Sequence, residues 1–161
     1  MNAQRFAQGD TYEQFLAKLP PAEKSGYRLS QRRAEAALAG SSPAGPESPL
    51  SVACVGESWC LDTRVNLPLL ALLFQRLSLS LRIFTRDQAA DLNVVRIPTF
   101  IFFNPSFQEV GRWVERPATV AHRLREGSEE EKKTVLSEYV AGKHHPETLA
   151  EISNLIGEAV R

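Results

Sequence analysis

The sequence predicts an α/β fold in which a central mixed β-sheet is flanked by helices, with extra helices at the N- and C-terminal ends. Residues 50–55 form a β-prone apolar run, residues 60–77 are leucine-rich at helical spacing, and residues 78–84 alternate apolar and polar side chains. This β-α-β pattern is typical of two parallel strands joined by a helix. Residues 100–103 are strongly apolar and are followed by a turn and a partner strand at 109–114, which predicts an antiparallel hairpin.

Two helices are expected before the first strand. Residues 12–19 carry apolar side chains at helical spacing, Asp10 or Thr11 is placed to cap them, and Pro20-Pro21 ends the helix. A second helix is expected over residues 22–39. These helices either cover one face of the sheet or mediate self-association into a homo-oligomer.

Residues 40–49 are dense in Gly, Ser and Pro, a composition typical of a flexible connector. We therefore divide the chain into an N-terminal helical extension with its linker at residues 1–49 and a domain with C-terminal helices at residues 50–161.

The remaining elements follow from local signals. Pro68 lies inside the predicted helix 60–77, where it removes a backbone hydrogen bond and should kink the helix. The other segments expected to be helical are 88–93 (short helix or turn), 118–126, 128–139 and the amphipathic segment 146–160.

Composition narrows the classes of function. The chain has 161 residues, 19 basic and 19 acidic side chains, and no strong charge bias toward nucleic acid or an anionic membrane. Its first residues lack the apolar core of a signal peptide, and the apolar stretch 67–73 is too short to span a membrane. The sequence therefore predicts a cytoplasmic location, where two cysteines are more typically reduced or catalytic than joined in a structural disulfide.

Cys60 is the candidate nucleophile. It follows the first strand and opens the predicted helix 60–77. Unpaired backbone N–H groups and the positive end of the helix dipole both favour a thiolate at that position. The alternative is a cysteine retained in a fold that only binds.

Three motifs in order carry a resemblance to a known family. The run Glu57-Ser58-Trp59-Cys60, with Pro68 eight residues after the cysteine, resembles the active-site strand and kinked helix of thioredoxin-fold proteins. Arg96-Ile97-Pro98-Thr99 resembles the cis-proline loop of that family. Gly111-Arg112-Trp113 followed by Arg116-Pro117 resembles a signature of a bacterial branch with an N-terminal helical extension. The resemblance covers roughly residues 50–124 and implies a thioredoxin-like fold.

Thr63 stands where this family carries its second active-site cysteine, which excludes a dithiol cycle through that position. Its hydroxyl could donate a hydrogen bond to the Cys60 thiolate or bond to its own backbone. Cys54 lies where thioredoxins carry a buried acid. We interpret it as a small core residue, with a role in resolving a Cys60 mixed disulfide as the alternative.

The expected substrate-binding residues are Trp59, Arg96, Ile97 and Pro98. Trp59 would offer an apolar surface beside the thiol or simply pack in its loop. A cis Pro98, as the resemblance implies, would turn the Ile97 backbone outward to pair with an extended peptide. Arg96 could attract a carboxylate, such as that of glutathione, or remain solvated.

Other polar residues are interpreted as structural. Asp62 is expected to be a solvated first-turn residue, and Glu57 is ambiguous. His144-His145 is expected to lie in an exposed loop and not to bind metal. Trp113 and Arg116-Pro117 are expected to fix the entry of the next helix.

The resemblance implies a thiol–disulfide oxidoreductase that works through one nucleophilic cysteine. Its substrate would be a disulfide-containing protein or a small thiol compound, and an external low-molecular-weight thiol, not a bound cofactor, would complete the cycle. The alternative is a degenerate binding module that holds peptides or partner proteins at the cis-proline edge. A thiol peroxidase is disfavoured because the expected proton-shuttle and arginine pattern around Cys60 is missing.

Overall fold

The computed structural model describes residues 1–40, 45–46 and 48–159. Residues 41–44 and 47 of the predicted connector and Val160 of the predicted last helix therefore lie outside the described residues.

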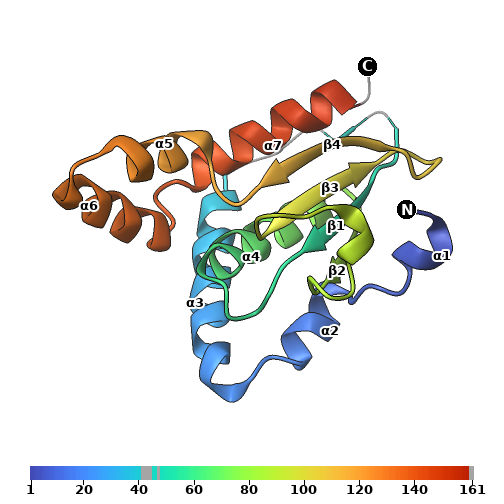
Figure 1. Ribbon diagram of the computed structural model, residues 1–161, viewed down its shortest axis with the longest axis horizontal. Coiled ribbons are helices and arrows are strands. Elements are labelled where there is room, and N and C mark those ends of the chain that lie inside the picture. The colour runs from blue at the N-terminus through green and yellow to red at the C-terminus, as the bar shows by residue number, and fades with distance from the viewer. Residues whose placement is uncertain (41–44, 47, 160–161) are drawn as a thin grey trace.

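Four strands form one mixed sheet in the order β2-β1-β3-β4 (Figure 1). Strands β1 and β2 are parallel, as the β-α-β pattern predicts, and β3 is antiparallel to both β1 and β4. The predicted α/β class and mixed sheet are thus confirmed. The strands are β1 (Ser51–Val55), β2 (Ser80–Phe84), β3 (Thr99–Phe103) and β4 (Glu109–Val114).

Apart from a short helix at the N-terminus, the helices lie close to their predicted bounds, and some of them have clear local start signals. Thr11 and Ser128 each form a capping box with the residue three positions later, which fixes where α2 and α6 begin. The helices are α1 (Ala3–Phe6), α2 (Tyr12–Ala17), α3 (Pro21–Leu38), α4 (Leu61–Arg76), η1 (Ala90–Leu92), α5 (Ala118–Glu126), α6 (Glu129–Val140) and α7 (His145–Ala159). The short helix α1 was not predicted.

Successive side chains of β1 point to opposite faces of the sheet and pack into two separate hydrophobic clusters. Val52 and Cys54 face a large cluster shared with α3, α4 and α7, whereas Ala53 and Val55 face a smaller cluster that includes Phe6 of α1. The central strand is therefore buried on both faces, and the first residue after it that reaches solvent is Glu57.

The N-terminal extension packs against α4 and along β2. Helix α3 packs along α4, and α2 lies beside β2 (Figure 1). Asp10 forms an isolated antiparallel bridge with Ile83, with two backbone hydrogen bonds of 2.8 Å, at the outer edge of β2. Tyr27 and Leu38 of α3 belong to the same hydrophobic cluster as Leu67 of α4. The division of the chain at residue 49 stays a prediction.

Among the described residues, no helix is both long enough and apolar enough to cross a lipid bilayer.

Candidate active site

A tight turn connects β1 to α4. The Cys60 N–H donates to the Glu57 carbonyl at 3.1 Å, and the Cys60 carbonyl accepts from the Arg64 N–H at 3.0 Å. Cys60 is the N-cap residue of α4, with extended φ and ψ of −72° and 127°, and its side chain makes no capping bond. The thiol is therefore free to face outward from the positive end of the helix.

The thiol meets the predicted cis-proline loop. The half-buried Cys60 Sγ lies 3.6 Å from the Ile97 carbonyl oxygen, to which the thiol donates. The Ile97–Pro98 peptide bond is cis. The fold thus brings together two segments that are 37 residues apart in the chain.

Two exposed apolar side chains lie next to the Cys60–Ile97 contact in the sequence. Trp59 immediately precedes Cys60 and is 69% exposed, which argues against simple loop packing. Val95, two residues before Ile97, is 82% exposed. Sequence reasoning missed Val95, because one valine in a loop carries no recognisable signal. Each is thus an exposed apolar side chain within two residues of one end of the Cys60–Ile97 contact.

Arg96 already has a carboxylate partner. Its exposed guanidinium lies 3.4 Å from Glu115 Oε2. A carboxylate on a substrate would have to share the guanidinium with Glu115 or displace it.

Thr63 does not make the contact expected of it. Its side chain is fully buried, and its hydroxyl has no hydrogen-bond partner within the described part of the chain. It therefore bonds neither to Cys60 nor to its own backbone. The hydroxyl faces Gly56 instead, where an added Cβ would lie only 3.0 Å from Thr63 Oγ1. Glycine at position 56 allows this close approach.

Cys54 behaves as a core residue. It is completely buried on β1, and burial, with a smaller effect of the Cys60 sulfur, raises the pKa of its thiol far above the usual value. A thiol that stays protonated is a poor nucleophile. Neither cysteine is in a disulfide.

Asp62 is buried, so the prediction of a solvated first-turn residue is wrong. Its carboxylate accepts from Arg116 at 2.7 Å and from the Tyr139 hydroxyl at 2.8 Å. Burial raises the pKa of Asp62, and Arg116 and Tyr139 partly oppose that effect. Because Arg116 offsets its charge, the effect of Asp62 on a Cys60 thiolate is smaller than its place in the chain suggests.

Pro117 is the N-cap residue of α5, the next helix, as predicted for the later signature. Trp113 instead donates from its indole nitrogen to Glu151 of α7, a helix further along the chain, at 2.6 Å. Arg116 also has a role that was not predicted: its ion pair with Asp62 connects the segment after β4 to the first turn of α4.

Arg86 connects the two loops of the site. Its backbone N–H donates to Glu57 Oε1 at 2.9 Å, and its guanidinium donates to the Val95 carbonyl. Glu57, ambiguous in the sequence, therefore anchors the turn. Nothing in the sequence distinguishes Arg86 from other surface arginines.

Tyr27, in helix α3 of the N-terminal extension, also contacts the turn between β1 and α4. It is 1% exposed, and its hydroxyl donates to the Ser58 carbonyl at 3.1 Å. Sequence reasoning placed Tyr27 on the apolar side of its helix but did not foresee this contact.

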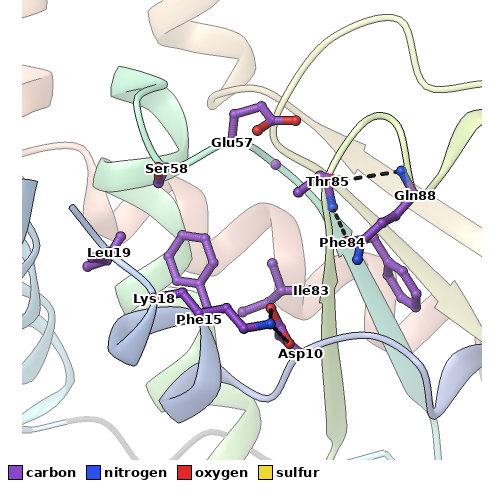
Figure 2. Close-up of a pocket in the computed structure, with 11 residues that line it drawn as sticks. Asp10, Phe15, Lys18, Leu19, Glu57, Ser58, Ile83, Phe84, Thr85 and Gln88 are labelled. Atoms are coloured by element: carbon purple, nitrogen blue, oxygen red, sulfur yellow. Dashed lines mark hydrogen bonds and ion pairs between the residues drawn. The ribbon is translucent and has the colours of Figure 1, made fainter.

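A cavity of about 140 Å³ lies between α2, the end of β2 and residues 56–58 of the turn (Figure 2). Phe15, Leu19 and Ile83 contribute apolar walls, and the Lys18–Asp10 ion pair lies at one side. Cys60 is not among the lining residues, so the cavity borders the turn without including the thiol.

His144 and His145 are buried, so their predicted placement in an exposed loop is wrong. His144 Nδ1 lies 3.0 Å from Glu147 Oε1, and His145 begins α7. Burial, reinforced by Arg33, lowers the pKa of His145 to about 4. No group of three His, Cys, Asp or Glu side chains suited to a metal ion occurs among the residues that the structure describes.

Solved structures share this fold. A protein of unknown function from Pseudomonas aeruginosa matches with a TM-score of 0.78 and 21% identity over 99% of each chain. An HIV epitope-scaffold matches with a TM-score of 0.76 and 21% identity over 96% of each chain. At this identity the likeness extends to the fold alone.

A search of curated proteins finds no match to the chain. The family model described as Thioredoxin matches residues 35–132, which is more than half of the sequence and includes Cys60 and the cis-proline loop. The chain is a member of the thioredoxin family.

Proposed function

We propose that the protein catalyses thiol–disulfide exchange through a single nucleophile, Cys60, with an external thiol completing the cycle. The observation that carries the proposal is the position of Cys60, half-buried at the N-cap of α4 with its sulfur beside the cis-proline loop, where an extended substrate would pair. A helix N-terminus favours the thiolate, which is the attacking form.

The exchange has two steps. The Cys60 thiolate attacks one sulfur of a substrate disulfide, the S–S bond breaks, and the departing sulfur leaves as a thiolate that takes up a proton from water. A low-molecular-weight thiolate then attacks the substrate sulfur of the mixed disulfide and releases Cys60 as a thiolate. The substrate half becomes linked to the external thiol, so electrons balance without a resolving cysteine. Thr63 offers no thiol for that role.

The proposed substrate is a disulfide-containing protein segment or a small disulfide. An extended segment would pair with the Ile97 backbone, and its apolar side chains would contact Trp59 and Val95, which are both largely exposed. A reducing compartment such as the cytoplasm would supply the external thiol.

A second candidate is a binding module without redox activity. The exposure of Trp59 and Val95 favours it, because exposed apolar side chains can contact a peptide whether or not the thiol reacts. Under this candidate Cys60 would be a contact residue only.

Treatment with oxidised glutathione, followed by intact mass measurement, separates the two. We expect a single glutathione adduct in the wild type and in Cys54→Ser, no adduct in Cys60→Ser, and removal of the adduct by reduced glutathione. No adduct on the wild type would favour the binding module. An internal disulfide without an adduct would make Cys54 a resolving residue and refute the one-thiol cycle.

A further inference from the structure

The turn that ends at Cys60 is held by a residue from outside the β-α-β unit. The Tyr27 hydroxyl donates to the carbonyl of Ser58, a central residue of the turn that the Cys60 N–H closes onto Glu57. The phenol ring is buried and packs edge-on against Phe15 of α2, with ring centroids 5.5 Å apart. The donor is therefore fixed by the packing of α2 and α3.

Burial is the main cause of the raised pKa of Tyr27, with smaller effects of Cys54, Glu23, Tyr12 and Cys60. The hydroxyl therefore stays protonated and can donate to the turn. From the segment after β2, the Arg86 backbone N–H donates to the Glu57 carboxylate of the same turn, and its guanidinium donates to the Val95 carbonyl. The turn thus has one anchor in the N-terminal extension and one in the segment after β2.

We propose that Tyr27 is a positioning residue, whose hydrogen bond to Ser58 sets the reactivity of Cys60 and so makes the N-terminal extension part of the site. The inference rests on the proposed function. Without the bond, the Ser58 carbonyl loses its donor and the Ser58–Trp59 peptide is free to rotate. The sulfur is then no longer held at the N-terminus of α4, the position that favours the thiolate.

The chain offers a matched control. Tyr12 of α2 is a second largely buried tyrosine in the extension, and its hydroxyl has no hydrogen-bond partner among the described residues. Tyr27→Phe and Tyr12→Phe therefore make the same chemical change in the same part of the fold. Only Tyr27→Phe removes a bond to the Cys60 turn.

Cys54 supplies an internal monitor of unfolding, because its side chain is completely buried. Rates of alkylation by iodoacetamide are measured from pH 6 to pH 9, with peptide mapping to separate labelling of Cys60 from labelling of Cys54. In Tyr27→Phe we expect Cys60 to react about 3- to 10-fold more slowly at the lower pH values, the effect of one net hydrogen bond. Cys54 should stay unlabelled, and Tyr12→Phe should match the wild type.

Equal Cys60 rates in Tyr27→Phe and the wild type would overturn the inference. So would equal slowing in the two variants, or labelling of Cys54 in step with Cys60, because either result would mean that Tyr27 only supports packing. The proposed function fails separately, when the wild type forms no glutathione adduct, and the alkylation rates decide the role of Tyr27 in either case.

Discussion

Thr63→Val tests whether the hydroxyl of Thr63 contributes to the site. Thr63 Oγ1 is buried, makes no hydrogen bond within the described chain and faces Gly56. Valine has nearly the same shape, and both residues are β-branched, so the substitution replaces an unpaired polar group by a methyl group with little change in helix propensity.

The expected gain follows from the cost of burying a polar group without a partner, which is about 1–3 kcal/mol. We expect Thr63→Val to raise the free energy of unfolding by about 1 kcal/mol or more, and the melting temperature by roughly 2–4 °C per kcal/mol for a chain of this size. Thr99→Val is the matched control. Thr99 is also buried, but its hydroxyl donates to the Arg96 carbonyl at 2.7 Å, so its loss should destabilise the fold by about 1 kcal/mol.

Urea unfolding of the two variants and the wild type measures these changes, and the alkylation rate of Cys60 is followed on the same samples. We expect Thr63→Val to leave that rate unchanged. If Thr63→Val loses as much stability as Thr99→Val, the hydroxyl has a partner. If Cys60 reacts more slowly in Thr63→Val, the hydroxyl does stabilise the thiolate and the reasoning is refuted.

Two further substitutions test buried titratable groups. Arg116→Gln leaves the Asp62 carboxylate buried without its cation, so we expect a loss of about 3 kcal/mol in urea unfolding, with partial recovery when Asp62→Asn is added; full stability in the single variant would contradict this. His145→Gln tests a pH effect. Because the folded pKa of His145 is about 4 and the unfolded value about 6.5, its contribution is fully present above pH 6.5 and is lost as the pH falls to 4, by up to about 3 kcal/mol. The raised pKa of Asp62 acts in the opposite sense. The variant should therefore lose less stability than the wild type between pH 7 and pH 4.5, and identical losses would count against a buried neutral His145.

The elements of the fold could be predicted because their signals are local. The segment Ala118–Glu126 has the predicted bounds, and the parallel pairing of Ser51–Val55 with Ser80–Phe84 follows from the helix between them. The position of Cys60 at the start of α4 could be predicted because the strand pattern ends shortly before it and the helical pattern begins at it. The expectation that the Ile97–Pro98 loop belongs to the site came from the family resemblance, because sequence spacing alone does not show that this loop lies next to Cys60.

The errors concern residues whose environment is decided by distant segments. Asp62 has the sequence context of an exposed helix start, but Arg116 and Tyr139 come from 54 and 77 residues away to neutralise and bury it. His144 and His145 follow a polar helix, yet the packing of α7 buries them. An anchoring role for Arg86 is equally invisible in the chain, because its partners are a side chain and a backbone carbonyl in two other loops.

A site with one reactive thiol depends more heavily on the position of that thiol than a dithiol site does. In a Cys-x-x-Cys pair the second sulfur completes the reaction, whereas here Thr63 is buried without a contact to Cys60, and Cys54 is a protonated core residue. Reactivity must then come from geometry, which means the turn that places Cys60 at the N-terminus of α4 and beside the cis-proline loop. That turn is fixed from the extension by Tyr27 and from the segment after β2 by Arg86. Loss of either anchor should therefore change the chemistry of Cys60 before it changes the fold.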